Sequence, residues 1–453
     1  MKKDILYAAA SLLLLSGCGS FLDVTPQGEV VPKTDDEFAA IIDNHLNEIE
    51  GGGDEYIIGN TETIGRLEAC ADDLDANIRV GNNLAAYAGE YINRRQSDWR
   101  EIFVIIRDCN IVIDNLKGRE SASGILSAAY AIKGILYYNL IRDWCDPWED
   151  ASSQMGIPIV DEFSINDMPV RASLRESADY AASLLDASLA LDPQDARFIF
   201  TEYIVKAYRA KLAFWCEDWE TTSAICRDII AHCGKELSGT DEFASMIQSE
   251  YAPKGEVLIR SHINNASELD WYFSYVRGYI ASRPASSDLV AMYEDGDVRP
   301  AVYFNARHFS AKRPEARLRL SEIVLMLAES EYHQGHREEA LAELNKLRRA
   351  RIVGVADFAE DTLPSVRSGE RIVVDAEGKP LTPLIQAILD ERRRELFCEG
   401  DRWYELKRNG RPEWWVITGG LKYTTKKYLY TAPIYRRDVE LNEGLIQNPG
   451  YID

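Results

Sequence analysis

The sequence predicts a mainly α-helical protein, in which helix pairs stack into a superhelical scaffold with long irregular loops and a few short strands on one side. Apolar residues recur at helical spacing over about 97–235 and again over 317–351. Between these two parts, 237–316 is rich in Gly, Pro, Ser and aromatic residues and has little helical periodicity. Helices far apart in the sequence are therefore expected to form one scaffold, and the intervening segment is expected to contribute loops.

The first seventeen residues have the pattern of a secretory signal. Lys2 and Lys3 precede an apolar run from Ile5 to Leu15, which is too short to span a bilayer. The residues Leu-Ser-Gly-Cys that end at Cys18 resemble the lipobox of bacterial lipoproteins. That resemblance implies cleavage before Cys18 and acylation of its sulfur and new amino terminus, which anchors a protein to a membrane. The alternative is an ordinary signal peptide followed by a chance cysteine.

Composition limits the function classes. The formal net charge of −23 argues against nucleic acid, which requires basic grooves. The eight cysteines include no C-x-x-C pair, so neither a disulfide framework nor a zinc site is expected. A bridge between Cys226 and Cys233 remains an open alternative. Many of the 23 Tyr and 9 Trp residues must lie in the core, and a surplus near a surface would suit stacking on sugar rings or peptide side chains.

Four helix pairs account for the scaffold. They are 97–116 with 127–144, 175–191 with a helix starting near Glu202, two helices within 205–230, and two within 318–351. In the last pair Gly335 separates two apolar stripes, and the second helix begins with small residues. This arrangement resembles a tetratricopeptide unit, and stacked units of that kind bury their apolar faces against their neighbours.

The remaining segments are predicted to be irregular. A short strand is expected over 256–262 and an extended crossing over 156–160, while 352–380 reads as a loop or small hairpin. Loops of such length in a compact domain are usually functional. The ligand site is therefore expected among them.

No catalytic residue is predicted. Glu391 and Glu395 lie one helical turn apart, and glycosidase chemistry uses a carboxylate pair. However, the arginines at 392–394 lie between them, which favours ion pairs on and beside a helix. Gly400 is expected to allow the sharp turn that follows this helix.

The histidines are not predicted to form a metal site. His333 and His336 have a spacing at which one metal ion would reach both, but they flank Gly335 in a helix–helix turn, where polar residues commonly face solvent. No metal and no cofactor is therefore expected.

Taken together, the motifs resemble the SusD/RagB family of outer-membrane nutrient-binding lipoproteins. The segments that carry the resemblance are 18–30, 97–114, 128–144, 284–300, 318–351, 388–410 and 428–451, in the family's order. The most specific are "ILDERRRELFCEGDRWYELKRNG" and "YLYTAPIYRRDVELNEGLIQNPGY". The implied organisation is a signal peptide over 1–17 and one SusD-like helical domain over 18–453, with the C-terminal family motifs in 388–453.

The resemblance also implies a function. Such proteins are lipid-anchored at the outer membrane, cover a SusC-like TonB-dependent transporter, and bind oligosaccharides, or in some members peptides, without catalysis. The expected location is therefore the outer membrane, facing the cell surface. A peptide-binding, RagB-like protein is the first alternative, and a glycan-degrading lipoprotein enzyme is an alternative of another class.

Two segments supply the predicted ligand residues. In 270–289 the candidates are Trp271, Tyr272, Tyr275 and Tyr279, whose flat rings suit the apolar faces of sugars, although half or more of these aromatics are equally consistent with core positions. In 76–96 the candidates are Asn82, Asn83, Tyr87 and Tyr91, because amide groups both donate to and accept from hydroxyls. The resemblance assigns both segments to the ligand-binding region.

Overall fold

The computed structural model describes residues 32–51, 56–75, 95–164, 166–191, 197–249, 253–261, 280–418 and 420–451, together with residues 89 and 92. The helices are α2 (Asp35–Gly51), α3 (Thr61–Cys70), α5 (Gln96–Leu116), α6 (Ser123–Trp144), α7 (Leu174–Leu189), α8 (Glu202–Trp215), α9 (Trp219–His232), α10 (Thr240–Ile247), α12 (Ser287–Val290), α13 (Arg299–Tyr303), α14 (Leu320–His333), α15 (Arg337–Arg351), α16 (Pro383–Glu395), α17 (Asp401–Arg408) and α18 (Arg436–Leu441), with short 3-10 turns at Glu120–Ala122 and Lys427–Tyr430. The strands are β1 (Met155–Pro158), β2 (Arg171–Ser173), β3 (Val257–Arg260), β4 (Arg317–Arg319), β5 (Trp414–Thr418) and β6 (Leu421–Thr425).

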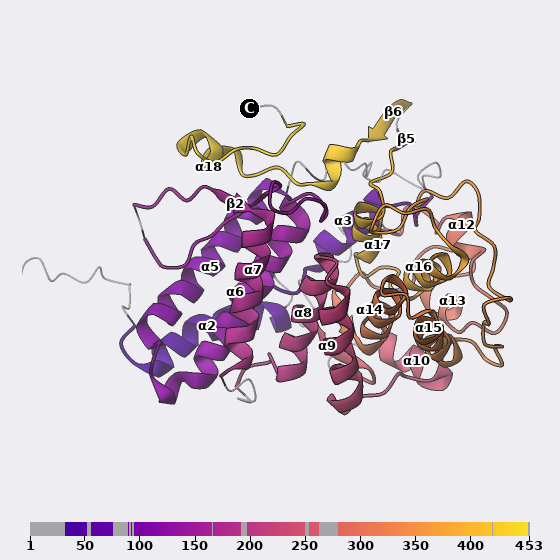
Figure 1. Ribbon diagram of the computed structural model, residues 1–453, viewed down its shortest axis with the longest axis horizontal. Helices are drawn as coiled ribbons and strands as arrows, with labels where there is room; N and C mark the ends of the chain where they lie inside the picture. The colour runs from indigo at the N-terminus through magenta and orange to yellow at the C-terminus, as the bar shows by residue number, and fades with distance from the viewer. Residues whose placement is uncertain are drawn as a thin grey trace, which may run out of the picture.

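The predicted superhelical scaffold is confirmed. Each of the helices α5 to α9 packs on the next, and α9 then packs on α14, which in turn contacts α15 and α16 (Figure 1). The chain leaves the scaffold after α9 and returns at α14, so these neighbours in space are separated by the segment that lacks helical periodicity. All four predicted helix pairs are present, with ends close to those expected.

Local sequence signals explain several helix ends. Ser173 and Glu176 form a reciprocal capping box at the start of α7. The side chain of Asn60 accepts a hydrogen bond from the backbone N–H of Thr63 and so caps α3. Gly335, between α14 and α15, has a φ of 83°, a conformation in which glycine has no steric penalty. The glycine turn predicted between these two helices is therefore correct.

The described strands form three two-stranded antiparallel sheets: β1 with β2, β3 with β4, and β5 with β6. β3 confirms the strand predicted over 256–262, and β1 lies in the segment predicted to be extended. The β5–β6 hairpin was not predicted, although Trp415 pairs with Thr424 and Ile417 with Lys422 in a regular ladder. As predicted, 352–380 is a loop, closed by a bridge between Val374 and Pro380.

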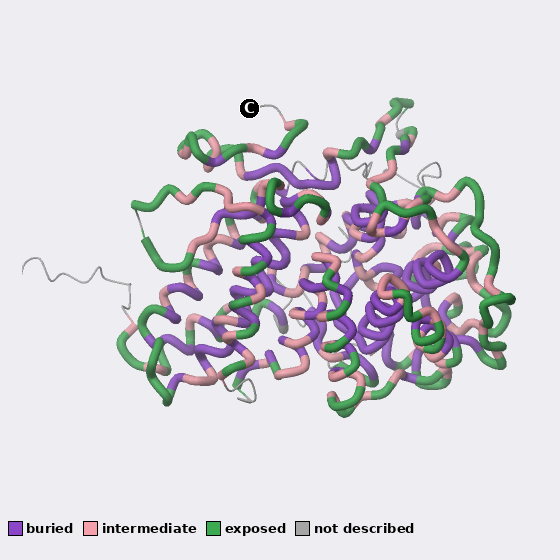
Figure 2. Tube along the Cα trace, viewed as in Figure 1, coloured by how far each residue is buried: buried purple, intermediate pink, exposed green. Residues whose placement is uncertain are grey.

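The core follows the scaffold helices. Figure 2 shows buried residues running through α6 and the α14–α16 group, whereas the β5–β6 hairpin and α18 are largely exposed and residues 429–434 between them are buried. Within the described residues one helical stretch, Glu120–Trp144, is long and apolar enough to cross a membrane, and 89% of its most apolar window is buried inside the fold. Burial on all sides is typical of the central helix of a packed bundle.

The described cysteines are all free thiols, including Cys226 and Cys233. The alternative of a bridge between these two is therefore wrong. Burial raises the pKa of the Cys226 thiol well above its ordinary value, so it stays protonated and packs as a small apolar side chain.

Candidate functional site

The residues just before the first predicted ligand segment are hydrogen-bonded to residues within the second. The backbone N–H of Asp75 donates to the carbonyl of Pro284 at 2.9 Å, and the N–H of Ser286 donates to the carbonyl of Asp73 at 2.8 Å. Leu74 and Ala285 form the antiparallel bridge between these bonds. We call residues 73–75 and 284–286 the stem.

The predicted site residues themselves lie outside the described residues. They are Asn82, Asn83, Tyr87, Tyr91, Trp271, Tyr272, Tyr275 and Tyr279, and the same holds for the lipidation residue Cys18. One stem strand, 73–75, immediately precedes the first ligand segment, and the other, 284–286, lies within the second, a few residues after Tyr279. The structure therefore brings together the described ends of the two segments on which the sequence placed the ligand.

Buried ion pairs fasten the stem to the C-terminal helices. Asp73 Oδ1 lies 2.6 Å from Nε of Arg393 on α16, and Asp72 accepts bonds of 2.7 and 2.9 Å from Arg402 on α17. Although burial alone would raise the pKa of Asp72, the guanidiniums of Arg402 and Arg393 hold it below its usual range. Asp72 is therefore ionised at neutral pH and attracts both arginines.

The β5–β6 hairpin is linked to Asp72 as well. Nε of Arg371 lies 3.4 Å from Oδ2 of Asp72, and its guanidinium lies over the Trp414 ring at 4.9 Å. Trp414 faces inward, whereas the next residue, Trp415, is 51% exposed, with Nζ of Lys422 lying 4.8 Å from its ring centroid. Trp415 was not among the residues predicted from the sequence. The signal that could have identified the hairpin is a Gly-Gly pair between two runs rich in aromatic and β-branched residues, 414–418 and 421–425.

The carboxylates considered for catalysis are held in ion pairs, as predicted. Glu395 is fully buried and lies 3.1 Å from Arg299, 2.6 Å from Arg319 and 2.9 Å from Arg351. Glu391, also fully buried, lies 2.6 Å from Arg299 and pairs with Arg394. Of the arginines interleaved in α16, Arg394 is thus a partner of Glu391, while the three partners of Glu395 come from α13, β4 and α15.

The protonation state of Glu391 does not suit a general acid. Burial by itself would raise its pKa, but Arg299 and Arg394 lower it to about 2. A general acid at neutral pH needs a raised pKa and access to the glycosidic oxygen. The pKa of Glu391 is lowered instead, and its side chain has no access to a glycosidic oxygen because it is 0% exposed.

The two histidines differ in a way the sequence did not reveal. The expectation that both face solvent is wrong for His333, whose side chain is 1% exposed and stacks on Trp219 at 4.3 Å. The imidazole is covered because α9 packs directly on α14 at this level. The expectation of solvent exposure is correct for His336, whose side chain is half exposed and lies 2.8 Å from Glu331. No group of three potential metal ligands occurs among the described residues.

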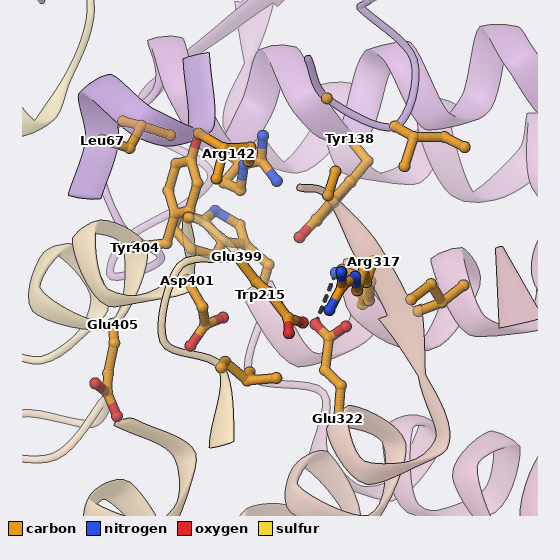
Figure 3. A pocket seen from close by; sticks show the side chains of 18 of the residues that line it. Leu67, Tyr138, Arg142, Trp215, Arg317, Glu322, Glu399, Asp401, Tyr404 and Glu405 are labelled. Carbon is orange, nitrogen blue, oxygen red and sulfur yellow. Dashed lines mark hydrogen bonds and ion pairs between the residues drawn. The ribbon is translucent and has the colours of Figure 1, made fainter. Parts of the chain in front are cut away.

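A polar cavity of about 90 Å³ lies beneath α3, between α8, α14, α16 and α17. Figure 3 shows Trp215, Arg317 and Glu322 converging on it from different elements. Nζ of Lys211 lies 2.7 Å from Glu322, and Arg392 pairs with Asp401 at 2.6 Å.

The C-terminal third of the chain matches a known protein family. Residues 305–451 match the model of the SusD family. A search of curated proteins finds no match.

Solved structures match over most of the chain. A SusD superfamily protein from Bacteroides fragilis has a TM-score of 0.72 and 16% identity, covering 92% of this chain and all of its own. A SusD-like carbohydrate binding protein from Bacteroides vulgatus has a TM-score of 0.68 and 17% identity, covering 91% and 98%. A laminarin binding SusD-like protein has a TM-score of 0.61 and 16% identity, covering 92% and 99%. The predicted resemblance to the SusD/RagB family and its fold is confirmed.

Proposed function

We propose that this SusD-like chain is a non-enzymatic glycan-binding lipoprotein of the outer membrane, which delivers oligosaccharides to a SusC-like TonB-dependent transporter. In this proposal Cys18 carries the lipid anchor and residues 18–453 work as one domain. The bound sugar contacts Asn82, Asn83, Tyr87 and Tyr91 from one segment and Trp271, Tyr272, Tyr275 and Tyr279 from the other.

The observation that carries the proposal is the stem. Two segments rich in aromatic and amide side chains extend from one hydrogen-bonded bridge, Leu74 with Ala285. Asp72 and Asp73 hold the first strand of that bridge against α16 and α17 through buried arginines. The stem holds one described end of each segment beside the other, and fixing the ends of a segment lowers the conformational entropy that is lost when a ligand binds. The carbohydrate-binding and laminarin-binding descriptions of two neighbours agree with a glycan as the ligand.

Trp415 is an additional aromatic candidate for the same site. It is exposed on a hairpin whose inner residue, Trp414, reaches the stem through Arg371 and Asp72. An exposed indole supported by a packed neighbour provides a flat surface for a sugar ring.

Calorimetry with panels of oligosaccharides and peptides tests the ligand class. Trp271→Ala is expected to weaken glycan binding by about 1–3 kcal/mol, the usual range for an aromatic contact at the centre of a site. Phe163→Ala removes another exposed aromatic residue and is the matched control, with unchanged affinity expected. Equal affinities in both variants would remove Trp271 from the site.

The alternatives give different results in the same experiments. Binding of peptides with no affinity for any oligosaccharide would support the peptide-binding, RagB-like alternative. Release of sugar products by the wild-type chain, lost in Glu391→Gln or Glu395→Gln, would support the enzyme alternative. The buried ion pairs of these two residues argue against that outcome.

The membrane and transporter parts of the proposal have separate tests. Cys18→Ser is expected to abolish incorporation of labelled fatty acid and to release the protein from the membrane fraction. Co-purification of a transporter barrel with the wild-type protein would support the partner. If the cysteine variant is still acylated, the anchor assignment is wrong.

A further inference from the structure

Several polar groups that line the cavity beneath α3 lack a hydrogen-bond partner, and more of them are donors than acceptors. Four buried N–H groups have no hydrogen-bond partner among the described residues: Nε1 of Trp215 and one terminal nitrogen, Nη1, of each of Arg317, Arg392 and Arg408. Each of these side chains is more than nine-tenths buried. Among the other lining groups, Oε1 of Glu405, an acceptor, and the hydroxyl of Tyr404, which can donate or accept, also lack a partner. Buried polar groups normally have partners, and the excess here is of donors.

Two of the arginines lie against the same ring. The guanidinium carbon of Arg408 lies 4.1 Å from the centroid of the Phe214 ring, and that of Arg392 lies 5.5 Å from it. Phe214 precedes Trp215 at the end of α8, so three of the four donors are grouped around one helix end. Donors from α8, α16 and α17 therefore lie close to the Phe214 ring in the lining of one small cavity.

The carboxylates nearby leave these nitrogens available. Arg392 uses Nε and Nη2 for Asp401, and Arg408 uses Nη2 for Glu329. Arg317 uses Nε and Nη2 for Glu315. Each arginine therefore keeps the N–H groups of Nη1 for another acceptor, and hydrogen bonds from a charged donor to an anion are among the stronger ones.

We propose that this cavity is a binding site for one small anion, of a size between a halide and phosphate, held by Nη1 of Arg392 and Arg408 and by the indole N–H of Trp215. The volume of about 90 Å³ has room for such a guest, since one water takes about 30 Å³. The anion would join α8 of the superhelix to α16 and α17, and so stabilise the packing of these three helices. The proposal is independent of the glycan function.

Bromide is a suitable probe because it scatters X-rays anomalously and can be titrated in solution. Crystals of the wild-type protein soaked in bromide are expected to show one anomalous peak within hydrogen-bond distance of Trp215 and Arg392. In solution, bromide at constant ionic strength is expected to raise the unfolding midpoint saturably.

Variants separate this site from general salt effects. Trp215→Phe removes only the indole N–H and part of the ring, and Arg408→Lys keeps the positive charge but loses Nη1. Each is expected to weaken bromide binding about tenfold, the loss of one hydrogen bond to a charged group. Trp144→Phe is the matched control, because its indole N–H bonds to the carbonyl of Pro433 away from the cavity.

The outcomes are distinct. A peak in the cavity, with saturation weakened in both cavity variants and unchanged in the control, supports the proposal. Ordered waters alone in the cavity, bromide only on the surface, binding at crystal concentration only, or equal saturation in all variants would overturn it.

Discussion

Glu395 is the residue whose removal is expected to damage the fold most. Its carboxylate accepts hydrogen bonds from Arg299, Arg319 and Arg351, and all four side chains are 0% exposed. In Glu395→Gln the side chain keeps nearly the same volume but loses its charge. Three guanidiniums then lose one of their carboxylate partners in a medium where charges are poorly solvated.

The expected magnitude follows from those contacts. Removing one partner of a buried ion pair costs about 3–5 kcal/mol, because the remaining charge is left uncompensated. Here Arg299 keeps Asp297 and Glu391, while Arg319 and Arg351 keep Glu256. We therefore expect a loss near the lower end of that range, about 3 kcal/mol.

Urea unfolding followed by circular dichroism measures this loss as a shift in midpoint. Glu440→Gln is the control, because Glu440 pairs with Arg436 on an exposed helix face and the pair is expected to contribute no more than about 0.5 kcal/mol. A loss below about 1 kcal/mol in Glu395→Gln, comparable to the control, would refute the claim that this cluster joins α13, β4, α15 and α16.

Three further predictions concern pH, backbone and ligand contact. Glu391 has a pKa lowered to about 2 against an unfolded value near 4.5, so it adds stability that is present above pH 4.5 and is lost as the pH falls towards 2; acid titration of the unfolding midpoint should show a loss that is reduced in Glu391→Gln. Gly400→Ala is expected to destabilise the fold by about 1–3 kcal/mol, since Gly400 has a φ of 79° and an added Cβ would lie 2.7 Å from Cδ1 of Ile64; an unchanged urea midpoint would contradict this. Trp415→Ala is expected to weaken glycan binding by about 1 kcal/mol with an unchanged midpoint, whereas Phe163→Ala should leave both unchanged; calorimetry decides whether the hairpin contributes to the site.

Periodicity allowed the helical scaffold to be predicted from the sequence. The stripe that begins at Leu320, the break at Gly335 and the turn at Gly400 are local signals, and each is confirmed in the structure. That Glu391 and Glu395 form ion pairs was also correctly expected, although only the pair of Glu391 with Arg394 uses an arginine within one helical turn. Patterns of this kind are encoded in neighbouring residues, so they need no knowledge of the rest of the chain.

Other features depend on residues that are distant in the sequence. The partners of Glu395 lie 96, 76 and 44 positions away, and no local pattern identifies them. His333 was expected at the surface and is instead covered by Trp219, because α9 and α14 become neighbours only after the chain returns to the scaffold. Burial of a polar side chain is decided by whatever packs over it.

By itself, the sequence determined the helical scaffold, the family resemblance and the segments rich in ligand-type side chains, because composition and periodicity are local. Only the tertiary structure decided that Asp75 meets Pro284, that Asp72 and Asp73 are held by Arg402 and Arg393, and that donors from three helices surround one cavity. These contacts form between segments hundreds of residues apart. The buried charges among them have partners only once the helices have packed, because pairing then offsets the cost of removing each charge from water.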